Sequence, residues 1–134
     1  MAFDKAKVYT STQINPSPTI SGEAGAAIED VRLKGVKFDE NGKIVLANAA
    51  GEVIVGVAII TNSTDIVAGE DIDIQIKDIG AVLAGGEIKA GAELAVDASG
   101  TFVTAAEGNY VAAIAMEPGK AGQVVRAQMA HYMK

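Results

Sequence analysis

The stretch VKFDENGKIVLANAAGEVIVGVAI, residues 36–59, decides the fold class of this chain. Two short runs rich in Val and Ile flank the sequence DENG at 39–42, where a glycine at position 42 suits the positive φ of a tight turn. Much of the pattern returns at 94–116 as LAVDASGTFVTAAEGNYVAAIAM. We therefore expect short strands joined by a turn, and an internal repeat of this unit within the chain.

The repeat covers most of the sequence in three registers. They lie at offsets of 58, 57 and 53 residues and pair Asp39 with Asp97, Ile54 with Val111 and Gly69 with Gly122. The residues lost between registers fall in TNSTDIVAGE, 61–70, which we expect to be a surface loop. We predict one β domain over 22–134 with related units at about 27–76 and 87–129, because neither unit alone could bury its apolar face. Chance similarity between two Gly-, Ala- and Val-rich segments is the alternative.

The spacing of turns and β-branched residues predicts an all-β fold. Short apolar runs lie between glycine-based turns at 43–46, 53–60, 71–77, 93–96, 102–104, 110–116 and 123–129. Ile72, Ile74 and Ile76 alternate with polar residues, as in a strand with one buried face. Many short strands with regular turns indicate a small β-sandwich or barrel, here built from two related β units, with an extended N-terminal arm and at most one short helix.

Residues 21–35, SGEAGAAIEDVRLKG, are ambiguous between helix and strand. Ala24, Ala27, Ile28 and Val31 have helical spacing, and Gly35 could end a helix. The corresponding stretch of the second unit, GGEIKAGAELAV, carries a glycine in its middle and is a poor helix former. Loop plus strand is the favoured interpretation, and one short helix stays open.

The first 21 residues differ from the rest and are predicted to form an extended arm. Pro16 and Pro18 push the residues before them towards extended geometry. The segment from Val8 to Ile14 alternates in the manner of an edge strand. Such an arm would become ordered against a partner, and a terminus without any partner is the alternative.

Composition excludes several classes of function. The chain has no cysteine, so disulfides, thiolate chemistry and cysteine-bound metals are absent. Its formal net charge of −6 is unfavourable for binding nucleic acid through phosphates. It has no apolar run long enough to cross a membrane, and its first residues do not resemble a secretory signal. We expect no cofactor, no nucleic-acid partner and no membrane association.

No residue pattern points to catalysis. His131 is the sole histidine and no G-x-S-x-G motif accompanies it, so a solvated or interface role is favoured. The acidic stretch 70–73 lacks the spacing of a calcium loop and is interpreted as the wet face of a strand. Lys89 resembles the modified lysine of biotinyl and lipoyl carriers, but Ile88 and Ala90 are not the neighbours of such a lysine. The glycosylation triplet at 62–64 is frequent by chance. We predict no enzyme, and no catalytic, cofactor or metal residues.

In LKGVKFDENGKIVLANAAGEVIVGVAI, residues 33–59, an Asp-x-x-Gly turn, a short strand, an Ala-rich linker and a GVA strand follow one another. This order resembles the small decoration, or cement, proteins of tailed-phage heads. An Ala-Gly-Glu turn at 68–70 introduces the next strand, and IKAGAELAVDASGTFVTA at 88–105 resembles the family's second pass. The similarity covers residues 22–129.

The resemblance implies a protein of the virion that binds the outer surface of the assembled head. Its partner would be the major capsid protein, whose lattice it would stabilise, and it could act as a homo-oligomer such as a trimer. The arm is the expected contact with the capsid or a neighbouring protomer. The candidate contact residues are Phe3, Val8, Tyr9, Thr10 and Ile14.

Two other classes of function remain open. Another virion subunit, such as a tail-tube or fibre component, would share the β fold but polymerise with itself. A β carrier or carbohydrate-binding module would use Lys89 or exposed aromatic rings, of which the chain has few.

Overall fold

The structure, a computed structural model, describes residues 17–134 and contains only β elements within that range. The strands are β1 Thr19–Glu23, β2 Ile28–Glu29, β3 Gly35–Phe38, β4 Ile44–Leu46, β5 Gly56–Ala58, β6 Asp65–Ile66, β7 Asp71–Gln75, β8 Ile79–Leu83, β9 Glu93–Val96, β10 Phe102–Thr104, β11 Tyr110–Ala115 and β12 Val124–Met133. The all-β prediction is therefore confirmed.

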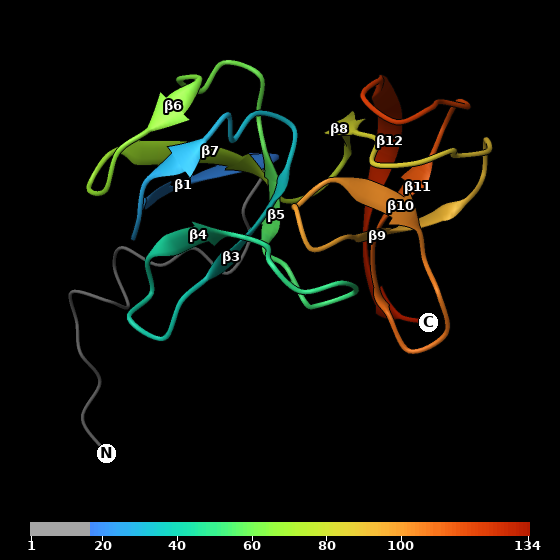
Figure 1. Ribbon diagram of the computed structural model, residues 1–134, viewed down its shortest axis with the longest axis horizontal. Helices are drawn as coiled ribbons and strands as arrows, with labels where there is room; N and C mark the ends of the chain where they lie inside the picture. Colours follow the sequence, from blue (N-terminus) through green and yellow to red (C-terminus); the bar gives the residue numbers. More distant parts are fainter. Residues whose placement is uncertain (1–16) are drawn as a thin grey trace.

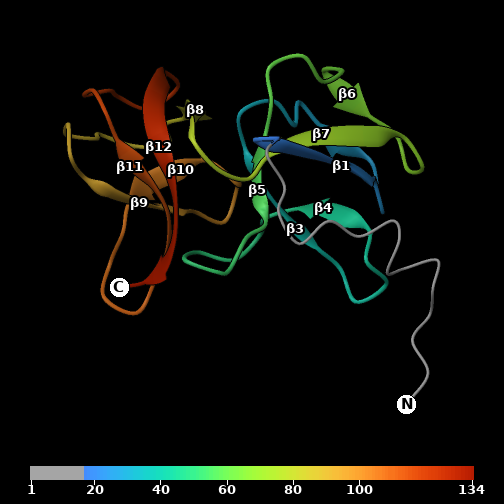
Figure 2. The same cartoon turned by 180° about the vertical axis from the view of Figure 1, so that it is seen from behind.

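Two five-stranded sheets lie side by side, one from each half of the chain (Figure 1). The first has the order β1-β7-β5-β3-β4, and the second has the order β8-β12-β11-β9-β10. Read in this direction, each strand of one sheet has its counterpart at the same place in the other. β2 and β6 form a separate small sheet. The reverse view in Figure 2 shows the same separation, with β5 near the junction of the halves.

The turn at 39–42 and its counterpart at 97–100 have the same pattern of hydrogen bonds. Asp39 Oδ1 accepts from the backbone N–H groups two and four residues further on, at 2.9 Å each. Asp97 Oδ1 accepts from the equivalent groups at 2.9 and 3.1 Å. Both turns end in a glycine of positive φ, +79° at Gly42 and +80° at Gly100. The local geometry recurs at the offset of 58 residues, and the duplication itself stays a prediction.

Each large sheet also curls until its two edges meet. Ala24, which follows β1, forms a parallel bridge with Ile44 of β4. Ala84, which follows β8, forms the same bridge with Phe102 of β10. Bridging an edge strand occupies part of its free backbone, which limits uncontrolled pairing with other chains.

The alternative of a helix within 21–35 is wrong. Residues 19–21, which we had assigned to the arm, lie in β1, and the backbone N–H of Ala24 donates to the carbonyl oxygen of Glu70 at 2.8 Å. Asp30 and Leu33 have φ values of 38° and 62°, outside the right-handed helical region. Pairing with distant strands overrides the helical spacing of the alanines.

The segment 61–70 is a loop for most of its length, but part of it is structured. Asp65 and Ile66 form β6, and Ile66 is buried against the first sheet's core. The prediction of a surface loop is thus correct for the residues outside β6 and wrong for Asp65 and Ile66, which form a strand.

The hydrophobic core continues from one half into the other. The cluster beneath the second sheet, which contains the buried ring of Phe102, also includes Ala47, Ile54 and Val57 of the first half. Backbone hydrogen bonds cross the same junction, such as that from Leu83 N–H to the carbonyl oxygen of Leu33 at 2.8 Å. The two sheets are therefore held against each other by packing as well as by polar contacts.

Candidate functional site

An apolar groove of about 360 Å³ opens where the two sheets meet. One polar side chain, that of Gln75, contributes to its lining. Its residues come from both halves: Leu33, Val57, Ile59, Ile60, Gln75, Ala81 and Val124. We call this set the junction groove.

The depth of the junction groove follows from the burial of its residues. Leu33 and Val57 are almost fully buried, so they form its floor. Ile60 and Val124 are 57% and 55% exposed, so they form walls that leave large aliphatic surfaces in water. Exposing such side chains has a free-energy cost of about 25 cal/mol for each Å² of apolar area. A groove of this kind favours an apolar occupant.

A left-handed residue sets the shape of the groove. Leu33 has a φ of +62°, which a leucine adopts only when its surroundings enforce it. Its N–H donates to the carbonyl oxygen of Ala58 at 2.7 Å, and its own carbonyl oxygen accepts from Leu83 N–H. Leu33 is therefore fastened to both halves, and its side chain stays between them.

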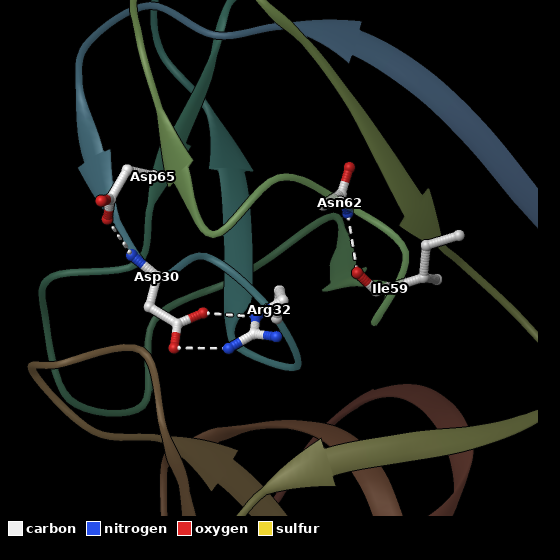
Figure 3. A network of polar contacts seen from close by, with 5 residues as sticks. All are labelled: Asp30, Arg32, Ile59, Asn62 and Asp65. Carbon is white, nitrogen blue, oxygen red and sulfur yellow. Dashed lines mark hydrogen bonds and ion pairs between the residues drawn. The ribbon is translucent and has the colours of Figure 1, made fainter.

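A smaller hollow of about 140 Å³ adjoins the groove, shares the Ile60 and Val124 walls, and has Asp30 and Arg32 in its otherwise aliphatic lining. Here Arg32 forms a two-pronged ion pair with Asp30, at 2.7 Å from Nε to Oδ1 and 3.1 Å from Nη2 to Oδ2 (Figure 3). The hydrogen bond from Arg32 lowers the pKa of the Asp30 carboxyl below its ordinary value. Asp65 Oδ1 accepts from the Asp30 N–H at 3.4 Å. The rim beside the groove is thus charged and held in a fixed geometry.

The loop that presents Ile60 is held by Asn62. Its Nδ2 donates to the carbonyl oxygens of Ile59 and Asp73, at 2.9 and 2.8 Å, and its Oδ1 accepts from Asp73 N–H at 2.9 Å (Figure 3 shows the bond to Ile59). The asparagine of the glycosylation triplet therefore has a structural role. It fixes one wall of the groove to β7.

The polar residues singled out in the sequence do not belong to the groove lining and make other contacts. His131 Nδ1 lies 2.8 Å from Tyr110 Oη, and neither ring nitrogen has a carboxylate or serine as its partner. Asp73 accepts from the Ser21 hydroxyl at 2.6 Å. Lys89 is exposed in the turn between β8 and β9. Within residues 17–134, no three His, Cys, Asp or Glu side chains are placed to hold a metal ion.

One further polar cluster lies on the second sheet, far along β12. Tyr132 Oη donates to Glu93 Oε2 at 2.7 Å, and Lys134 Nζ lies 3.3 Å from Glu93 Oε1. These bonds lower the pKa of Glu93, and the bond to the carboxylate raises the pKa of the Tyr132 phenol. The hydrogen bond from Tyr132 to Glu93 connects the end of β12 to β9 across the intervening strand β11.

Within residues 17–134 no helix is long and apolar enough to cross a membrane.

The predicted contact residues Phe3, Val8, Tyr9, Thr10 and Ile14 all lie outside the described residues. The junction groove was not anticipated from the sequence. The adjacent aliphatic pair Ile59 and Ile60, which directly follows β5, was one available signal, because it ends an apolar run at the start of the polar loop 61–65. Its second wall, Val124, comes from the other half and carries no such signal.

Three comparisons with known proteins bear on this fold. The family described as phage cement protein matches residues 24–130. Among solved structures, the N base of the head fibre gp8.5 of bacteriophage phi29 is similar, with a TM-score of 0.63 and 22% sequence identity over 87% of this chain and 97% of that chain. At this identity the likeness shows the fold alone. No curated protein matches the sequence.

Proposed function

The chain belongs to the phage cement protein family, and from this premise we propose that it binds the major capsid protein on the outer face of the assembled head. Membership makes it a capsid cement protein and a component of the virion on its capsid. The proposed role is structural and non-enzymatic: the protein bridges neighbouring capsid subunits and strengthens the shell.

The observation that carries this proposal is the extent of the family match. Residues 24–130 begin directly after β1 and end within β12, so the match includes both large sheets apart from β1 and the last residues of β12, together with the groove between them. The earlier resemblance rested on turns and short strands of 33–59 and 88–105, which lie within this range.

The mechanism we propose is thermodynamic linkage. A protein that binds the assembled lattice and not its free subunits stabilises the lattice by mass action. Many copies on one shell add their individual contributions, and a protomer with several contacts gains from their high effective concentration. A rigid β body suits this role, because little conformational entropy is lost when it binds.

Two finer features belong to the same proposal. The arm, through Phe3, Val8, Tyr9, Thr10 and Ile14, contacts the capsid or a neighbouring protomer as an added strand or apolar anchor. The protein assembles as a trimer, so that three arms engage the lattice together.

The test uses emptied, expanded phage heads mixed with the purified protein. We expect the protein to sediment with the heads and to raise the temperature at which they break open. Unexpanded precursor heads are the matched control, because they present the same capsid protein in another lattice. Failure to bind either form would overturn the proposal. Filaments or rings of the pure protein would instead indicate a tail-tube or fibre subunit, and a mass increase at Lys89 would indicate a carrier.

A further inference from the structure

We propose that, in the free protein, the junction groove is the docking site for the N-terminal segment of the same chain, with the side chain of Ile14 between the Ile60 and Val124 walls. The inference concerns the free protein and stands independently of the capsid partner. It also leaves the part of the arm before residue 11 available for other contacts.

The path of the chain brings this segment to the groove. Thr19 of β1 pairs with Gln75 of β7, and Gln75 belongs to the groove lining. The carbonyl oxygen of Pro18 accepts from Ile76 N–H at 2.8 Å. The chain therefore passes within one residue of the groove at the point where the N-terminal segment begins.

The length of the segment is sufficient. From Ile14 to Thr19 the chain spans at most about 18 Å when extended. Pro16 and Pro18 disfavour a helix here, so much of that reach is available. The Ser17 hydroxyl accepts from Thr19 N–H at 3.2 Å, so the backbone directly before β1 is held by a local side-chain hydrogen bond.

Both the apolar pattern and the charge of the segment fit this site. Apart from the prolines, Ile14 is the first apolar residue on the N-terminal side of β1. Residues 17–78 carry 11 Asp and Glu against 5 Lys and Arg, whereas residues 1–16 carry 1 against 2. Residues 1–16 therefore have a small excess of basic side chains, whereas residues 17–78, along which they would lie, have an excess of acidic ones. Opposite charges favour this placement, although salt screens the attraction between exposed groups.

The docking of Ile14 can be tested with a pair of introduced cysteines, because the chain has no cysteine of its own to compete for the disulfide. In the full chain, Ile14→Cys is combined with Ala81→Cys, which lies in the groove lining. After mild oxidation with oxidised glutathione at low protein concentration, we expect a disulfide within one chain, seen as the loss of two hydrogens in the intact mass. The first control pairs Gln13→Cys with Ala81→Cys, because adjacent side chains of an extended segment point in opposite directions. The second pairs Ile14→Cys with the exposed Val67→Cys, away from the groove.

A second measurement keeps the inference testable if the disulfide geometry is unfavourable. Methyl NMR signals of Ile60 and Val124 report occupancy of the groove directly. We expect Ile14→Asp to shift them and Gln13→Asp, with the same added charge on the opposite face of an extended segment, to leave them in place. Equal disulfide yields in matched and control pairs, disulfides only between two chains, or unchanged methyl signals in Ile14→Asp would each overturn the inference.

Discussion

The Nε2 atom of His131 lies 2.6 Å from the backbone carbonyl oxygen of Ile76. A carbonyl oxygen can only accept, so Nε2 is the donor in this bond, and Nδ1 is hydrogen-bonded to the Tyr110 hydroxyl at 2.8 Å. His131 is in β12 of the second sheet, and Ile76 directly follows β7 of the first. The single histidine of the chain therefore connects the two halves.

Replacing His131 should loosen this connection. We expect His131→Ala to lower the free energy of unfolding by about 1 kcal/mol, because one net hydrogen bond between the halves is lost. Urea denaturation of the purified protein measures the change. Lys89→Ala, at an exposed turn, is the control and should stay within about 0.5 kcal/mol of the parent. Equal stabilities for the two variants would contradict the assigned role.

Because the two sheets approach each other closely at Gly35, a substitution there should destabilise the protein more than the replacement of His131. A Cβ atom at this position would lie 2.5 Å from Val96 Cγ1 and 3.1 Å from Ile54 Cδ1. We expect Gly35→Ala to destabilise the protein by about 1–3 kcal/mol through overpacking. Gly86→Ala is the matched control, since its nearest atom would be at 3.7 Å, and it should be close to neutral. Thermal unfolding of both variants decides the matter, and a neutral Gly35→Ala would show that the junction can relax.

Glu52 predicts a pH dependence of stability. Burial raises the pKa of its carboxyl, but hydrogen bonds from Lys37 and from the backbone N–H groups of Asn48 and Ala49 outweigh this and hold the pKa below the usual 4.5. Because the folded-state pKa is depressed, the stabilisation is present above the unfolded-state pKa and is lost as the pH falls through the folded-state pKa.

We therefore expect Glu52→Gln to be less stable than the parent at about pH 7, and the difference to shrink below pH 4.5 as the parent's carboxylate is protonated. Urea denaturation over a pH series measures this. Glu40→Gln, on the exposed turn at 39–42, is the control. A difference that stays constant with pH would mean that shape and not charge makes Glu52 stabilising.

The boundary of β1 sharpens the test of the arm. Deleting residues 2–16 leaves Thr19–Glu23 intact, so we expect the circular dichroism spectrum to be retained while capsid binding is lost. Deleting residues 2–20 also removes the start of β1 and its pairing with β7, so this variant should be less stable. Sedimentation with expanded heads measures binding, and full binding by the shorter deletion would refute the arm's proposed role.

Local sequence signals were sufficient for most of the strands. β9 and β10 lie within their predicted bounds of 93–96 and 102–104, because each borders an Asp-x-x-Gly turn that defines where a strand ends. β8, the sequence IGAVL at 79–83, was missed. Its residues do not alternate between apolar and polar, and it becomes a strand because it pairs with residues 124–128, more than 40 residues away in the sequence.

By itself the sequence determined the class of fold, the turns and the recurrence of a β pattern, since these depend on residues that are near neighbours along the chain. Only the tertiary structure decided how the two sheets meet and what lies between them. Ile60 and Val124 become walls of one groove because strands that are distant in sequence pair and the sheets curl. Leu33 lies in the floor between these walls because backbone hydrogen bonds from both halves hold it in a left-handed conformation. Long-range packing of this kind leaves no periodic trace in a single sequence.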